Sequence, residues 1–113
     1  MNEELIDRFH KEMIGIYESS LNLTPPYRAT RFHQMVLRLG GHETAKRLLA
    51  TGNPSEGFVR LFLINPKYLR LSVEYLVLQQ PWRILFDEQL LAIAEKRLLD
   101  MKVDLPIPKD EVQ

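Results

Sequence analysis

The sequence contains no cysteine. This absence excludes a disulfide framework, a thiolate zinc site and a cysteine nucleophile. It also suits a chain that works in a reducing compartment. We therefore expect the bacterial-type cytoplasm as its location.

Long apolar runs are also lacking, since no stretch approaches the roughly 18 apolar residues of a membrane helix. The opening "MNEELIDRFHKE" is acidic and amphipathic. A signal peptide has a basic start and an apolar core, so we expect none here. A membrane is accordingly not among the expected partners.

Complete catalytic motifs are missing as well. Gly52 and Gly57 have the spacing of a phosphate loop, but Phe58 and Val59 follow where that loop has Lys and Ser or Thr. His42-Glu43 begins like a zinc-peptidase helix, but Lys46 stands at the second ligand position. There is no Gly-x-Ser-x-Gly elbow. The sequence therefore predicts a non-enzymatic protein with no catalytic or metal-ligating residues, no cofactor and no identifiable small-molecule substrate.

What is present is a helical pattern of apolar residues, broken by glycine and proline. It predicts an all-α fold, a compact orthogonal bundle of about six short helices. We expect one domain over residues 1–102 and an extended or frayed tail over 103–113. The segment "YLRLSVEYLVLQ" alternates as a strand would, but it has no partner strand, so we expect a helix. The expected helices cover residues 3–20, 30–39, 42–50, 56–62, 73–80 and 88–101.

Five residues are expected to have structural roles. Gly40 and Gly41 should end the second helix, and Gly57 should serve the turn around "PSEGF". Glu74 lies in the most apolar run, so we expect it to be buried and paired with Arg70 or Arg60. Trp82 should be buried and fill space in the hydrophobic core.

The net charge of zero hides an uneven distribution. Residues 1–20 carry −3, residues 21–47 carry +4, residues 48–86 carry +2 and residues 87–113 carry −3. A basic middle between acidic ends suits a contact with nucleic-acid phosphates, or a head-to-tail contact between copies of the chain. The candidate contact residues are Arg28, Arg31, Arg38, Lys46 and Arg47.

The glycine pair also gives residues 32–49 the outline of a helix-turn-helix motif. The position that should seat a recognition helix, six residues beyond the turn glycine, is Lys46 or Arg47. An apolar residue is needed there. A plain helical hairpin is the alternative interpretation.

Three stretches stand out together: "YRATRFHQMVLRLGGHETAKRLL", "PSEGFVRLF" and "LRLSVEYLVLQQPWRILFDEQLLAIAEKRL". They resemble a small, uncharacterised bacterial domain that occurs alone or attached to larger proteins, some in restriction and mobile-element settings. Arg70 stands where relatives commonly have an acid. The resemblance implies a helical domain and supplies no reaction.

The sequence thus favours a helical module that acts through protein contacts, either with a partner protein or by self-association. Nucleic-acid binding by the basic segment 28–47 is the alternative. The two differ in salt dependence, because phosphate contacts weaken steeply as salt rises.

Overall fold

The first helix shows how apolar spacing fixes the architecture. The structure, a computed structural model, describes residues 2–106. Helix α1 spans Glu3–Leu21 and has Glu3 and Glu4 in its first turn, where the helix dipole favours acids. Phe9 and Met13 lie four residues apart on the same face and are fully buried. This face anchors α1 to the rest of the molecule.

Helices α2 (Thr30–Leu39) and α3 (Gly41–Ala50) are joined by a single residue, Gly40. Its backbone angles, φ 85° and ψ 155°, lie in a region that essentially only glycine adopts. The prediction that Gly40 ends the second helix is therefore confirmed. For Gly41 the prediction was wrong, because this residue is the buried first residue of α3.

The reason lies in the contact between α1 and α3. The backbone N–H of Gly41 donates a hydrogen bond to Nδ1 of His10, with 2.9 Å between the two nitrogens. A Cβ atom at position 41 would lie 2.8 Å from the Cα atom of His10. Gly41 thus lets two helix backbones touch, and the His10 ring accepts from one of the free N–H groups at the start of α3.

We expect Gly41→Ala to lower the free energy of unfolding by about 1–3 kcal/mol, since backbone must move to admit the methyl group. Gly15→Ala is the matched control. Gly15 lies inside α1 with open space where its Cβ would be, so alanine should raise stability by roughly 0.5–1 kcal/mol there. Urea titration followed by circular dichroism measures both. Equal effects of the two substitutions would refute the close contact.

Three short helices follow, each begun by a side-chain cap. They are α4 (Glu56–Ile64), the 3-10 helix η1 (Pro66–Leu71) and α5 (Val73–Val77). Ser55, Asn65 and Ser72 precede them, and each accepts a hydrogen bond from a backbone N–H of the first turn. The prediction of a helix rather than a strand for the segment "YLRLSVEYLVLQ" is confirmed.

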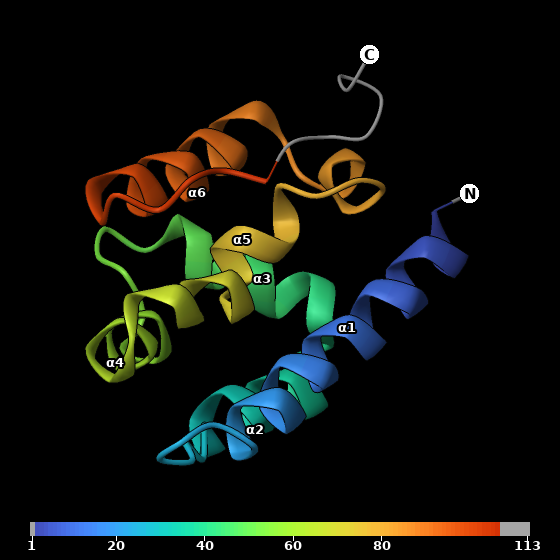
Figure 1. Ribbon diagram of the computed structural model, residues 1–113. Helices are drawn as coiled ribbons and strands as arrows, with labels where there is room; N and C mark the ends of the chain where they lie inside the picture. The colour runs from blue at the N-terminus through green and yellow to red at the C-terminus, as the bar shows by residue number, and fades with distance from the viewer. Residues whose placement is uncertain (1, 107–113) are drawn as a thin grey trace.

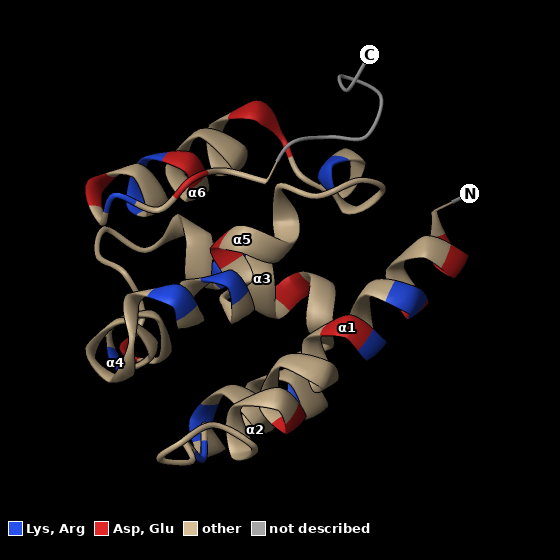
Figure 2. Ribbon diagram, viewed as in Figure 1, with Lys and Arg blue, Asp and Glu red and all other residues tan. Residues whose placement is uncertain are grey.

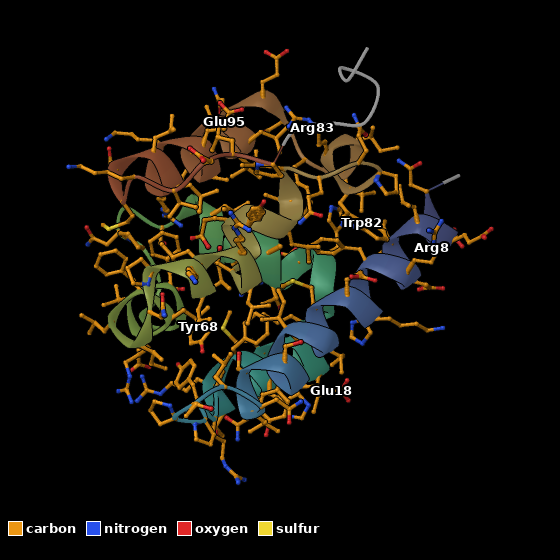
Figure 3. All side chains as sticks on the ribbon, in the orientation of Figure 1. Arg8, Glu18, Tyr68, Trp82, Arg83 and Glu95 are labelled. Carbon is orange, nitrogen blue, oxygen red and sulfur yellow. The ribbon has the colours of Figure 1, made fainter. Side chains whose placement is uncertain are left out.

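The chain then turns through η2 (Trp82–Leu85) into α6 (Glu88–Asp100), which Asp87 caps. Trp82 is buried, as predicted, and its ring lies 5.8 Å from that of Phe9. Phe86 completes an aromatic cluster, 5.4 Å from Phe9. Figure 3 shows Arg8 beside Trp82, with its guanidinium 5.5 Å from the ring centre. The cluster joins α1 to η2.

Figure 1 shows how the helices are arranged. Helices α3 and α5 occupy the middle, with α6 on one side and α1 and α2 on the other, while α4 lies at one end. No strand occurs among residues 2–106. The predicted all-α class is confirmed.

The predicted tail begins at residue 103. Residues 103–106 form no helix, and Val103 and Leu105 pack against the core as partly buried side chains. The remainder, residues 107–113, lies outside the described residues. Within the described part of the chain, no helix combines the length and the apolar character needed to cross a bilayer.

Candidate functional site

A cavity lies where α1, α2, α4 and the start of α5 meet. Its volume is about 460 Å³, within the range of ligand pockets in proteins. Residues from the α1–α2 loop and from the start of α4 complete its wall. We call this cavity the α2–α4 pocket.

Part of the pocket wall is apolar. This part draws on five elements, so the pocket exists only in the folded chain. Its aliphatic and aromatic side chains suit the burial of an apolar group. They include Ile16, Phe32, Met35, Leu48, Phe58, Leu61 and Val73.

The rim of the pocket is basic. Arg28 from the α1–α2 loop, Arg31 from α2 and Arg60 from α4 all line it, and all three are exposed. The Arg60 guanidinium lies 5.4 Å from the centre of the Tyr27 ring, an attractive cation–π arrangement. This contact holds one of the three cations against the pocket wall.

Tyr27 is a polar group of the wall. Burial raises the pKa of its hydroxyl, and the nearby Glu56 carboxylate raises it further, while Arg60 acts in the opposite sense. The hydroxyl therefore stays protonated at neutral pH. It is available as a hydrogen-bond donor to an acceptor in the pocket.

The five basic residues that the sequence analysis named lie in different surroundings in the structure. Arg28 and Arg31 line the pocket. Lys46 and Arg47 both pair with Glu43 on α3, at 3.4 and 3.0 Å, and these two partners lower the pKa of Glu43. Arg38 lies in the last turn of α2, where a cation suits the helix dipole. In Figure 2 basic residues gather at the beginning of α2.

The glycine turn does produce a helical hairpin from α2 and α3. Lys46, six residues beyond Gly40, keeps a side chain 43% exposed and pairs with Glu43. It therefore does not provide the buried apolar contact that seats a recognition helix.

Beneath the pocket lies a buried ion pair. Glu74, part of the pocket wall, bonds through Oε2 to Nη1 of Arg97 at 3.0 Å. Both side chains are buried, at 2% and 7% exposed. Burial of Glu74 is confirmed, but the predicted partners were wrong. Arg60 lies over Tyr27, and Arg70 is exposed on η1.

Arg97 also completes the end of α3. Its guanidinium donates to the backbone carbonyls of Leu48, Leu49 and Thr51, at 3.0, 3.4 and 2.6 Å. Carbonyls at a helix C-terminus lack partners within the helix, so a buried end needs such donors. One arginine of α6 therefore holds α3 and α5 together.

Sequence reasoning missed Arg97, although its position carried a signal. It lies three residues after Ala94 and next to Leu98, on the buried face of α6. A charged residue within an apolar helical stripe requires a buried partner.

Burial raises the pKa of Glu74, and the Arg97 guanidinium and the backbone N–H of Glu74 oppose that shift.

The three histidines serve the fold. His10 accepts from Gly41, the His42 ring is hydrogen-bonded to the Leu85 carbonyl at 2.8 Å, and the His33 ring stacks on Tyr17 at 3.9 Å. Among residues 2–106, no three His, Asp or Glu side chains gather as a metal site would require.

Gly57 lies at the wall of the pocket. A Cβ atom there would make only ordinary contacts, 3.9 Å from the Ser55 and Tyr27 hydroxyls. No close approach therefore requires glycine at this position, unlike Gly41. A larger side chain at position 57 would extend into the pocket.

Comparison with known proteins adds no identification. The chain matches no protein-family model, no curated protein and no solved structure. The resemblance to a bacterial helical domain stays a prediction.

Proposed function

We propose that this chain is a non-enzymatic interaction module that takes an apolar group of a partner protein into the α2–α4 pocket. The observation that carries the proposal is the pocket itself, which combines an apolar wall with a rim of three arginines. A folded scaffold with one such pocket can recognise a partner without performing chemistry.

The polar groups of the pocket support a binding role rather than catalysis. Glu74 is bonded to Arg97, and the Ser55 and Ser72 hydroxyls accept backbone N–H groups as helix caps. A nucleophile requires a base within hydrogen-bonding reach. The side chains of Glu74, Ser55 and Ser72 are already engaged in hydrogen bonds that stabilise the fold.

The rim supports a protein partner over an enclosed small molecule. Arg28, Thr30, Arg31, Glu56 and Arg60 are all exposed pocket residues. Small-molecule sites usually bury most of their ligand. A pocket whose rim is this exposed suits a side chain that projects from the surface of a partner protein.

Binding of nucleic acid by residues 28–47 is the second candidate. Its support is the exposed cations Arg28, Arg31 and Arg38. Lys46 and Arg47 offer less, because both already share Glu43. A gel shift with mixed DNA and RNA at low salt tests this candidate, and binding should fall steeply as salt rises.

The leading proposal is tested by selecting random peptides displayed on phage against the chain and measuring the affinity of the recovered peptides. We expect Gly57→Leu, which fills the pocket, to weaken binding by about tenfold or more. Gly52→Leu is the matched control, since Gly52 has open space around it and does not line the pocket. Failure to recover any peptide, or peptides indifferent to Gly57→Leu, would contradict the proposal.

A further inference from the structure

The charges around the α2–α4 pocket are not balanced. Three guanidinium groups line it, against the carboxylates of Glu56 and Glu74. Glu74 is already bonded to Arg97 beneath the pocket. An occupant therefore meets three cations and one available anion, Glu56.

The three cations come from three different segments. Arg28 belongs to the loop after α1, Arg31 to the first turn of α2 and Arg60 to the second turn of α4. An anion held between them would bridge the start of α2 and α4, which are distant in sequence. Guanidinium groups bind carboxylates with paired, charge-assisted hydrogen bonds.

Tyr27 adds a neutral donor to this set. Its hydroxyl lies close to Gly57 at the pocket wall, and its ring supports Arg60. The apolar side chains line the same pocket. The pocket thus places an apolar surface directly beside donors for an anion.

We propose that the group bound in the α2–α4 pocket is an acidic-apolar peptide segment, in which an apolar side chain fills the pocket while a neighbouring carboxylate binds Arg28, Arg31 and Arg60. This inference rests on the proposed function and specifies the chemistry of the partner. The peptide is favoured over nucleic acid because the pocket provides an apolar wall for a side chain. A nucleic acid needs a basic track along its backbone, whereas these three arginines line a single pocket.

Three small probes of equal chain length test the charge preference directly. Octanoate, 1-octanol and octylammonium are titrated into the ¹⁵N-labelled chain, and amide shifts of pocket residues are followed. We expect octanoate to bind about tenfold more tightly than 1-octanol, and octylammonium to bind most weakly. The triple variant Arg28→Gln/Arg31→Gln/Arg60→Gln should bring octanoate to the affinity of 1-octanol. Arg38→Gln, which alters a cation of α2 outside the pocket wall, should leave the preference unchanged.

The selected peptides give a second, independent readout. We expect Asp or Glu next to an aliphatic or aromatic residue, and an approximately tenfold loss of affinity when that acid becomes its amide. Peptides that bind in the pocket without an acid, or octylammonium binding as well as octanoate, would overturn this inference and leave the proposed function intact. If neither the peptides nor the probes bind in the pocket, the proposed function fails with it. Salt-sensitive binding of an oligonucleotide mixture that the same triple variant abolishes would instead favour nucleic acid.

Discussion

Arg97→Met is expected to lower the free energy of unfolding by about 3–5 kcal/mol, because it leaves the buried Glu74 carboxylate without its cation. The substitution also removes the donor from three backbone carbonyls at the end of α3. Unfolding in urea, followed by the fluorescence of the single tryptophan, measures the loss.

Two further variants separate the roles of Arg97. Lys96→Met is the control, since Lys96 pairs with Asp100 on the surface of α6 and its side chain is 76% exposed. It should change stability little. Glu74→Leu combined with Arg97→Met should be no less stable than Arg97→Met alone, because both buried charges are gone. A single Arg97→Met variant as stable as the native chain would contradict the structural role.

The loss should also depend on pH. Burial raises the pKa of Glu74 in the folded chain. A raised folded pKa adds stability below the pKa of an ordinary glutamate, and this contribution is lost as pH rises through the folded value. Removing the Arg97 cation raises the folded pKa further, so Arg97→Met should cost least in acid and more as the pH approaches neutrality.

Phe9→Ala is expected to cost about 3–5 kcal/mol of stability, since a fully buried ring leaves a cavity behind. Phe9 contacts Trp82 and Phe86, so its loss loosens the contact between α1 and η2. Circular dichroism in urea is the suitable measurement, because the substitution alters the surroundings of the tryptophan.

Ile84→Ala is the matched control for Phe9→Ala. Ile84 lies in the same η2 segment, two residues from Trp82, but is 63% exposed. Its truncation should have a much smaller effect. If both substitutions cost the same, the aromatic cluster is not the contact that holds α1 in place.

The helices were predictable because their signals are local. Apolar residues at helical spacing marked α1 and α6, and the caps Ser55, Ser72 and Asp87 stand directly before helices. The turn at Gly40 was also predictable from the sequence, since glycine adopts the positive φ that Gly40 has between α2 and α3. Local chemistry decides these features, so one sequence suffices.

The contacts between distant segments were not predictable in the same way. The apolar sequence around Glu74 predicted its burial. Its partner could not be predicted in this way, because Arg97 lies 23 residues away on another helix. Gly41 pairs with His10 across 31 residues. Nothing in the spacing of either residue identifies its partner, because only the packing of α5 against α6 and of α3 against α1 brings the partners together.

The candidate site shows the same division. Arg28 and Arg31 were named from a cluster of charge in the sequence, yet Arg38, Lys46 and Arg47 belonged to that cluster as well. Arg60 and the apolar wall join Arg28 and Arg31 only in the folded chain. A charge count along the sequence cannot separate residues that pair with Glu43 from those that line a pocket.

The most direct test of the pocket is the position of a bound peptide. Nuclear Overhauser contacts between a selected peptide and the side chains of the chain report that position atom by atom. We predict contacts from an apolar peptide side chain to Met35, Leu48 and Leu61. Contacts only to Val59 and Leu63, two exposed apolar residues of α4 that do not line the pocket, would contradict the account.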